Sequence, residues 1–514
     1  MRHTIIRSAL LACVSVFLMS CYQDLSTDAS ISLSDIEITS ELERFDMYYG
    51  ETFTFTPEVK IKGRKASSIE YKWEMTITPQ DDEYELDLGS EKTLTYYVGN
   101  TPSSKPYIIR LTVKDKETGL ARSKSWDAYV ASSLGEGILV AHTADGGETS
   151  DLSLLKSKYV TEGYTSSPKI THNLFTLYNG APIDGRVNAL VPVVSSNLAA
   201  YNLNRVYIGT DTDLIAVNYL NYEEDMRNAA LFQFTEGKET VAVEHLFNYA
   251  EYATGLISNG RFYNCLCLAA HLYTECMYHN TPSDIFSTAT LAATKGYKGI
   301  VILLDVNNGS FNFMQGRMLG GSFAEIQAKP TYSLRGATPV ACGMMKQDKA
   351  GYVIKASDGT YYATVLTTDG QTSSLIDYNI SEIASDIADA KGFAFCDNTD
   401  FFYYFTDSKI NVIRTVGSSP SHSTLSWKPE NKTEKVTGLY HYMQGWYGTQ
   451  QISSYEHTID THRQQMIITT YDQTAKEGKV YLYAFNPSTG LFKNPSNGIY
   501  GGFNEITAIT PTLR

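Results

Sequence analysis

An aromatic segment near the C-terminal end of the chain has the residue types of a ligand-binding surface. Tyr440, Tyr442, Trp446 and Tyr447 fall within residues 440–448, next to glycines and glutamines that favour a loop. Aromatic faces beside amide groups can stack on sugar rings or cover a peptide backbone, and large exposed aromatics are unfavourable unless they bind something. We predict that these four residues bind a ligand, with packing of the same rings in a core as an equal alternative.

A group of cysteines and histidines lies near the middle of the chain. Its members, which are soft ligands of the kind that zinc or copper prefers, are Cys265, Cys267, His271, Cys276 and His279. Their spacing matches no standard zinc motif, and cysteine also packs well as a small apolar side chain. The sequence therefore favours cysteines buried on a strand over a metal site, and leaves one disulfide open.

Two pairs of oxygen-bearing side chains have the spacing of calcium ligands. Asp211 lies two residues from Asp213, and Asp305 two residues from Asn307. Both pairs also fall where hairpin turns are expected, and turns favour Asp and Asn because these side chains bond to the nearby backbone. The turn interpretation is favoured, so we expect no metal.

Sequence motifs of the common enzyme classes are missing. The chain has no Gly-x-Ser-x-Gly elbow, no His-Glu-x-x-His helix, no phosphate loop and no dinucleotide fingerprint. We expect no catalytic residue, no cofactor and no enzymatic activity. The alternative is a glycoside hydrolase or lyase that assembles its carboxylates from distant segments and so leaves no local motif.

Composition indicates a sheet-rich protein with an acidic surface. The 514 residues include 42 Lys and Arg against 56 Asp and Glu, a formal net charge of −14. This charge repels nucleic acid and anionic lipid headgroups, so we expect neither as a partner. The 37 tyrosines and 37 glycines favour strands and turns, and the length favours one large unit with a small one.

The N-terminus has the features of a lipoprotein signal peptide. Arg2 and Arg7 are basic, residues 8–19 are apolar, and the small Ser20 precedes Cys21. The apolar run is too short to span a bilayer, which takes about 20 residues. We predict a signal peptide over 1–20 and lipidation of Cys21, so that the membrane is contacted through the lipid alone. An ordinary secretory peptide is the alternative.

The next segments predict a tether and a small β-sandwich. Residues 21–35 are rich in Ser, Thr and Asp, as flexible linkers are. Residues 36–132 alternate apolar and polar side chains, as at 52–56, 70–75 and 107–113, which is typical of antiparallel strands with one buried face. About seven such runs separated by turns make a sandwich, with Trp73 as its core anchor.

Residues 133–514 contain seven strand pairs, repeated roughly every fifty residues. The pairs are 137–142 with 151–155, 205–210 with 214–217, 255–257 with 261–263, 299–304 with 311–313, 351–354 with 361–363, 401–405 with 410–413, and 465–469 with 479–483. Radial repetition lets each sheet bury both faces, so the repeats predict a seven-bladed β-propeller. A long array of sandwiches is the alternative, because alternation alone does not distinguish the two.

The chain end is expected to close the propeller. Residues 502–509 form a strand pattern that can pair with the strand at Gly137 and complete a blade. Helical patterns are confined to 239–253 and 381–391, as insertions between blades. In the second, Ile380, Ile383 and Ile387 have helical spacing and should cover apolar surface.

The sandwich segment resembles a PKD-like, immunoglobulin-type domain. The resemblance rests on Tyr-Lys-Trp at 71–73 and Leu-Thr-Val-Lys-Asp at 111–115, before a turn at Gly119. The Asp-Phe-Gly-Asp-Gly stretch of typical PKD domains is missing, which indicates a divergent branch. With the lipidation motif, the tether and the propeller-like repeats, the whole order resembles the PKD-like family lipoproteins of Bacteroidota.

This resemblance implies an accessory role in nutrient uptake. Such lipoproteins are associated with SusC/SusD-like systems, in which a TonB-dependent outer-membrane transporter and its lipoprotein lid import oligosaccharides or peptides. We expect a lipoprotein on the cell surface that binds or presents glycan or peptide to that importer. A purely structural scaffold of the importer complex is a further alternative.

Overall fold

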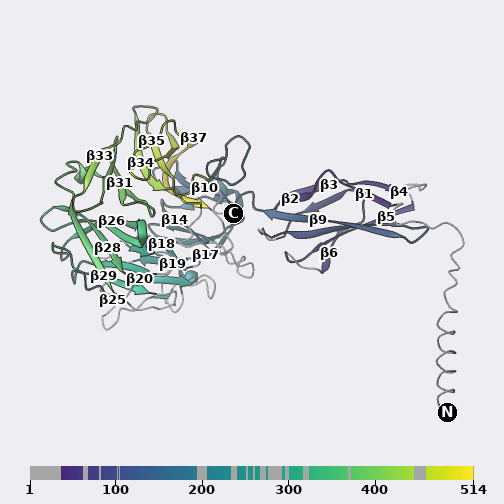
Figure 1. Cartoon of the computed structure of the whole chain (residues 1–514), viewed down its shortest axis with the longest axis horizontal. Helices are drawn as coiled ribbons and strands as arrows, with labels where there is room; N and C mark the ends of the chain where they lie inside the picture. The colour runs from purple at the N-terminus through teal and green to yellow at the C-terminus, as the bar shows by residue number, and fades with distance from the viewer. Residues whose placement is uncertain are drawn as a thin grey trace, which may run out of the picture. The chain divides into compact units, whose positions relative to one another are not determined.

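Almost all regular structure in the protein is β-strand (Figure 1). The computed structural model describes residues 36–61, 68–79, 83–100, 102–103, 105–193, 205–232, 240–250, 253–258, 261–266, 274–275, 292–295, 300–315, 323–368, 372–444 and 459–512. The chain divides into two compact units, Met1–Ala131 and Ser132–Arg514.

The first unit is a β-sandwich of the immunoglobulin type. Its strands are β1 (Ile36–Thr39), β2 (Arg44–Tyr48), β3 (Thr52–Phe55), β4 (Glu58–Ile61), β5 (Ile69–Thr76), β6 (Tyr84–Gly89), β7 (Leu94–Tyr97), β8 (Tyr107–Asp115) and β9 (Ala121–Ala131). One sheet has the order β2-β9-β8-β5-β6, and β1-β4 and β3-β7 form two smaller sheets. The pairing of β2 with β9 is parallel, and the others are antiparallel.

Aromatic side chains fill the core of the sandwich. Trp73 on β5 is 1% exposed and lies 5.8 Å from the ring of Trp126 on β9. Phe45 stacks on Trp126 at 5.2 Å, and Phe55 meets the same ring edge-on. The indole nitrogen of Trp73 donates a hydrogen bond to the carbonyl of Glu91, so its one polar atom is satisfied inside the core. This confirms Trp73 as the core anchor.

In the described part of the second unit there are seven sheets, each built on four strands in the order inner, second, third and outer, and one of them has a fifth strand. The inner strands are β38 (Glu505–Thr512), β14 (Val187–Val193), β18 (His245–Ala250), β22 (Ala292–Lys295), β26 (Thr338–Met345), β30 (Gly392–Phe395) and β34 (Glu434–His441). The second strands are β10 (Gly137–Thr143), β15 (Arg205–Thr210), β19 (Ala253–Ser258), β23 (Ile300–Asp305), β27 (Lys349–Lys355), β31 (Phe401–Phe405) and β35 (Gln465–Asp472).

The third and outer strands complete each blade. The third strands are β11 (Thr149–Lys156), β16 (Leu214–Asn218), β20 (Arg261–Leu266), β24 (Ser310–Gln315), β28 (Tyr361–Thr368), β32 (Ile410–Arg414) and β36 (Glu477–Ala484). The outer strands are β12 (Lys169–Thr171), β17 (Glu224–Arg227), β21 (Thr274–Glu275), β25 (Ala324–Glu325), β29 (Ser373–Asn379), β33 (Ser421–Thr424) and β37 (Gly498–Phe503). A short strand, β13 (Ile183–Asp184), pairs with β11 as well.

The seven sheets form a closed ring. Each inner strand contacts the next, from β38 through β14, β18, β22, β26, β30 and β34 back to β38. The ring closes because β38 pairs with β10 antiparallel, from Gly137 opposite Thr512 to Thr143 opposite Glu505. The predicted seven-bladed propeller and its closure by the chain end are thereby confirmed, and the sandwich-array alternative is wrong.

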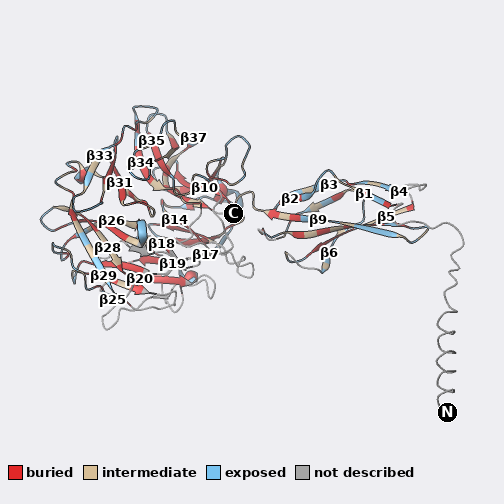
Figure 2. Ribbon diagram, viewed as in Figure 1, coloured by how far each residue is buried: buried red, intermediate tan, exposed pale blue. Residues whose placement is uncertain are grey.

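Burial is greatest in the second and third strands of the blades (Figure 2). All seven residues of β10 and all five of β31 are buried, whereas the outer strand β33 is largely exposed. These central strands are covered on both faces by neighbouring blades, which explains their continuous apolar sequence. They correspond to the seven predicted strand pairs.

The two predicted helices are not formed as expected. Residues 245–250 of the first are the inner strand β18, because a blade needs its fourth strand there. The second segment consists of turns and a short 3₁₀ helix, η7 (Ile387–Asp389), yet Ile380 and Ile387 are buried against the blade as predicted. The described residues contain one α-helix, α2 (Leu174–Asn179). No helix among them is long and apolar enough to cross a membrane.

Candidate functional site

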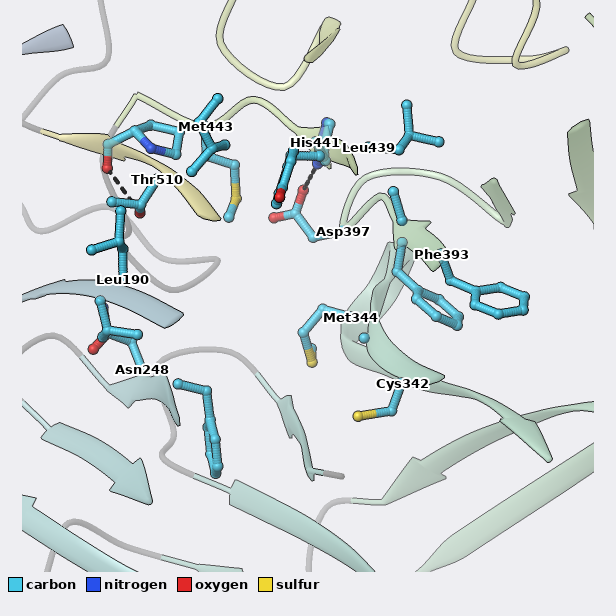
Figure 3. Close-up of a pocket in the computed structure, with 18 of the residues that line it drawn as sticks. Leu190, Asn248, Cys342, Met344, Phe393, Asp397, Leu439, His441, Met443 and Thr510 are labelled. Atoms are coloured by element: carbon cyan, nitrogen blue, oxygen red, sulfur yellow. Dashed lines mark hydrogen bonds and ion pairs between the residues drawn. The ribbon is translucent and has the colours of Figure 1, made fainter. Parts of the chain in front are cut away.

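A cavity of about 380 Å³ lies among the inner strands of the propeller (Figure 3). Residues of β14, β18, β26, β30, β34 and β38, and residues that directly follow them, line it. We call it the axial cavity. Its volume is within the range of small-molecule sites, which is roughly 300–1,000 Å³.

Apolar, aromatic and sulfur-containing side chains make up much of the wall. Phe247 comes from β18, and Phe393 and Phe395 come from β30. Met344 lies on β26, and Met443 lies two residues after the end of β34. Cys342 and Met344 are two residues apart on β26, so both side chains project from the same face of the strand toward the cavity (Figure 3). Each of the five named apolar residues keeps part of its surface exposed.

A buried ionic group lies at one part of this wall. The Nδ1 atom of His441 is 3.6 Å from Oδ1 of Asp397, and Nη2 of Arg463 is 2.8 Å from Oδ2 of the same carboxylate. The side chains of His441 and Asp397 are only 4% and 8% exposed, while Arg463 is 27% exposed. We call these three residues the Asp397 cluster. Figure 3 shows Asp397 and His441 facing each other at the cavity edge.

The backbone positions this cluster firmly. Arg463 has a φ of 56°, in the left-handed region that residues with a Cβ rarely adopt. Its N–H donates to the carbonyl of Tyr442 at 3.0 Å, and its own carbonyl accepts a bond from the side-chain amide of Asn398 at 2.8 Å. These bonds connect the chain after β34 with the chains that follow β30 and precede β35, and they hold the guanidinium against Asp397.

Several polar atoms of the cluster are buried without a hydrogen bond. They include Oδ1 of Asp397, Nε2 of His441 and Nε of Arg463. Burial lowers the pKa of His441, with a further lowering by the charge of Arg463, and the Asp397 carboxylate only partly opposes this. The imidazole is therefore neutral at pH 7. Because buried polar atoms are almost always hydrogen-bonded, these unpaired atoms at a cavity call for a partner such as a ligand or ordered water.

Two of the four predicted aromatic residues, Tyr440 and Tyr442, lie within the described part of the chain, and both contact the core around Ile467 and Val480. Tyr440 lies on β34 and lines the axial cavity, where burial raises its pKa to about 12. Tyr442 is 1% exposed and packs in the core with Ile467 and Val480, so the alternative of core packing applies to it. The expected loop begins only after His441, because Tyr440 belongs to an inner strand. Trp446 and Tyr447 lie outside the described residues, as does Cys21.

The predicted metal candidates have structural roles where they can be followed. Cys265 is fully buried, 3.8 Å from the hydroxyl of Tyr207, while Cys267, His271, Cys276 and His279 lie outside the described residues. Within the described ranges no group of His, Cys, Asp and Glu is arranged to hold a metal ion.

Both predicted calcium-ligand pairs, Asp211 with Asp213 and Asp305 with Asn307, fall at hairpin turns. Oδ1 of Asp305 accepts hydrogen bonds from the backbone N–H groups of Asn307 and Asn308, both at 3.0 Å. Asp211 accepts a bond from the side chain of Asn188, and Asp213 lies 3.5 Å from Arg227. The turn interpretation is therefore confirmed for Asp305 and Asn307.

The Asp397 cluster could not be found by sequence reasoning. Its three residues come from three separate segments, so their spacing carries no motif. His441 lies inside the aromatic segment, which was the one available signal, but nothing in the sequence connects it with Asp397 or Arg463.

Fold and cavity together define a seven-bladed β-propeller with a ligand-sized axial cavity. No protein-family model and no curated protein matches the chain. Among solved structures, the chain is similar to a quinonprotein alcohol dehydrogenase-like protein from Bacteroides thetaiotaomicron, with 12% identity, a TM-score of 0.39, and coverage of 92% of this chain and 98% of that chain.

Two further structures show a comparable likeness. PorZ of Porphyromonas gingivalis, a surface component of the type IX secretion system, has 11% identity and a TM-score of 0.34 over 77% of this chain and 51% of that chain. AztD from Citrobacter koseri has 9% identity and a TM-score of 0.34 over 86% of this chain and 97% of that chain. At these identities the likeness assigns no activity to this chain.

Proposed function

We propose that this chain is a lipid-anchored, non-enzymatic binding protein of the outer membrane, whose propeller holds part of its ligand in the axial cavity. It would act at the cell surface beside a TonB-dependent transporter and its lipoprotein lid, to which it presents glycan or peptide. The anchor would be the lipid on Cys21, whose sequence context supports it.

The observation that carries this proposal is the composition of the cavity wall. Partly exposed aromatic and thioether side chains surround a small number of buried polar atoms, three of which, on Asp397, His441 and Asn248, have no hydrogen bond. Ligand sites commonly combine an apolar wall with a few polar groups that fix orientation.

The same wall argues against a glycosidase at this position. Such enzymes use two carboxylates on either side of the scissile bond, about 5–10 Å apart. Among the lining residues that the structure describes, Asp397 is the single carboxylate, and Arg463 occupies one of its oxygens at 2.8 Å. The described wall thus offers a place for binding but no acid and base pair.

Lipid anchoring would place the bound ligand close to the transporter. A lipid on Cys21 would confine the propeller to the membrane surface and raise the concentration of captured ligand beside the importer, without any new contact. An acidic chain with net charge −14 has little affinity of its own for anionic headgroups, so the lipid would supply membrane attachment.

Purification of the tagged chain from solubilised outer membranes tests the proposal. We expect the transporter and its lid to be recovered together with the chain. Recovery of the chain without them would remove the uptake role, and recovery without any ligand retention would favour the scaffold alternative.

The Cys21→Ala variant separates anchoring from folding. It should leave the folded units and their ligand affinity unchanged, release the chain from the membrane fraction, and abolish uptake-linked function. The matched control is Cys13→Ala, which changes a cysteine within the signal segment and should leave the chain anchored. Full uptake function of a released Cys21→Ala protein would contradict the proposal.

A further inference from the structure

We propose that the axial cavity binds an aromatic side chain that carries a neutral hydrogen-bond donor, the phenol of tyrosine or the indole of tryptophan in a peptide. This inference rests on the proposed binding function, and it chooses peptide over glycan as the group that enters the cavity.

The apolar wall fits an aromatic ring. Phe247, Phe393 and Phe395 present ring surface from two inner strands, and Met344 and Met443 present thioethers. Aromatic rings prefer offset or edge-on contacts with other rings, and sulfur packs well against a ring edge. A flat apolar group can therefore contact favourable surface on several sides of this cavity.

The buried polar atoms require a donor from the ligand. Nδ1 of His441 faces the acceptor Oδ1 of Asp397 at 3.6 Å. These surroundings place the imidazole proton on Nδ1, which leaves Nε2 as an acceptor. Nε2 of His441, Oδ1 of Asp397 and Oδ1 of Asn248 are all buried without a hydrogen bond, so the residues of the wall have three unmet acceptors.

The charge balance favours a neutral donor over a cation. The guanidinium of Arg463 lies 2.8 Å from the Asp397 carboxylate and already neutralises it. An ammonium group would meet this guanidinium at short range, and burying it would also cost its hydration. A phenol O–H or an indole N–H supplies the missing hydrogen bond without either penalty.

A sugar ring fits the described wall less well. A pyranose carries several hydroxyls, and each one that is buried without a partner is destabilising. The described wall has few polar side chains beyond Asp397 and His441, namely His245, Asn248, Tyr440 and Thr510. The phenylalanine and methionine side chains of the wall would leave hydroxyls of a pyranose without partners, whereas an otherwise apolar ring with one donor loses no hydrogen bond against them.

Binding of small probes to the purified full chain tests the inference. N-acetyl-tyrosine amide is compared by calorimetry with N-acetyl-phenylalanine amide, which differs by the phenol hydroxyl alone. We expect the tyrosine probe to bind at least tenfold more tightly. Methyl β-glucopyranoside and N-acetyl-lysine amide should show no binding at the same concentrations.

Two variants locate the binding site. His441→Phe removes the acceptor Nε2 with little change of volume and should abolish the preference for tyrosine, while His422→Phe alters a histidine that bonds to Tyr404 outside the cavity and should not. Met344→Trp fills the cavity and should abolish binding of both probes. Its control is Met226→Trp, on the outer strand β17.

Each other outcome overturns the inference in a defined way. Equal binding of the tyrosine and phenylalanine probes would show that the polar atoms play no part, and preferential binding of the glucoside would assign the cavity to glycans. If no probe binds while the importer is still recovered with the chain from membranes, the inference fails and the proposed accessory function stands.

Discussion

Strand β34 carries a buried ionic group at each end, and the two groups differ in how completely they are hydrogen-bonded. Glu434 opens the strand, and its carboxylate is fully surrounded by donors. His441 closes the strand beside Asp397, and both side chains keep an unpaired polar atom. Because both groups lie on the same strand, they differ in the hydrogen bonding of their polar atoms and not in the fold around them.

Both carboxylate oxygens of Glu434 have hydrogen-bond partners. Oε1 accepts bonds from Nζ of Lys479 at 2.9 Å and the backbone of Asn431, and Oε2 accepts from Thr470 at 2.8 Å and Tyr481 at 2.5 Å. Burial by itself would raise the pKa of Glu434, but the bonds from Tyr481, Lys479 and Thr470 outweigh it and the pKa lies below its usual value. Such a group stabilises the blade and has nothing left to offer a ligand.

The Asp397 cluster has polar atoms without hydrogen bonds, and it lies at the wall of the axial cavity. Its unpaired atoms make the folded state less stable than a fully bonded arrangement of the same groups would be. Unmet hydrogen bonds at a cavity wall are therefore the feature that separates a candidate binding site from a structural ion pair.

Loss of the Glu434 charge should have the largest effect. Glu434→Gln leaves the ammonium of Lys479, which is 10% exposed, with only the half-exposed Glu430 as a charged partner. Removing one partner of a buried pair costs about 3–5 kcal/mol, because the other charge stays buried. Urea denaturation followed by circular dichroism measures the loss, and a change below about 1 kcal/mol would mean that the pair is not structural.

Acidification should destabilise the propeller next most strongly. Burial lowers the pKa of His142 to about 4, and its Nε2 bonds to Ser153 at 2.7 Å. Because the unfolded histidine binds a proton at pH 6.5 and the folded one does not, stability is full above pH 6.5 and falls toward pH 4, by about 3 kcal/mol in total.

A matched pair of variants assigns this pH dependence. His142→Phe should flatten the fall in stability between pH 6.5 and 4, as measured by thermal unfolding at several pH values. His441, whose pKa burial also lowers, should contribute in the same direction, so His441→Phe should flatten the profile too. An unchanged profile in both variants would contradict the neutral buried state of these imidazoles.

Asp397→Asn should have a smaller effect on stability and a clear effect on binding. Arg463 loses a charged hydrogen bond, worth about 2 kcal/mol, but its side chain is 27% exposed and water can replace the carboxylate in part. Binding of the tyrosine probe should weaken at least tenfold in calorimetry. If the variant unfolds as readily as Glu434→Gln and binds the probe normally, the distinction between the two groups is wrong.

The exposed ion pair beside Glu434 should contribute least to the free energy of unfolding. Lys435 lies 3.4 Å from Asp407, and both side chains are more than half exposed. Lys435→Ala should therefore change the free energy of unfolding by less than about 1 kcal/mol, since solvent screens such pairs. A larger loss in the same urea titration would show that charge near β34 matters regardless of burial.

The sequence predicted those strands that are buried on both faces, because their burial appears as a short continuous run of apolar residues. The second and third strands of every blade were found, because neighbouring blades cover both faces and the strands are continuously apolar, as in residues 401–405. Inner strands such as β18 and β34 were missed. They face a cavity on one side, so their sequences mix polar, aromatic and small residues and resemble a helix or a loop.

The residues of the predicted binding site were likewise identified only in part. Tyr440 and Tyr442 both pack against one core, but Tyr440 also lines the cavity, whereas Tyr442, two positions along, is 1% exposed. Exposure of a ring depends on which neighbouring blade covers it, and periodicity within one strand does not record that.

What the sequence alone determined is the repeat. Local apolar runs and hairpin turns specify seven blades, because each strand pair depends on residues close together in the chain. The strand pattern at residues 502–509 indicated the closure, although its partner β10 lies at the other end of the propeller segment. Only the tertiary structure decided the site. Asp397, His441 and Arg463 meet because ring closure brings the ends of separate strands to a common axis, and no spacing along the chain encodes that meeting.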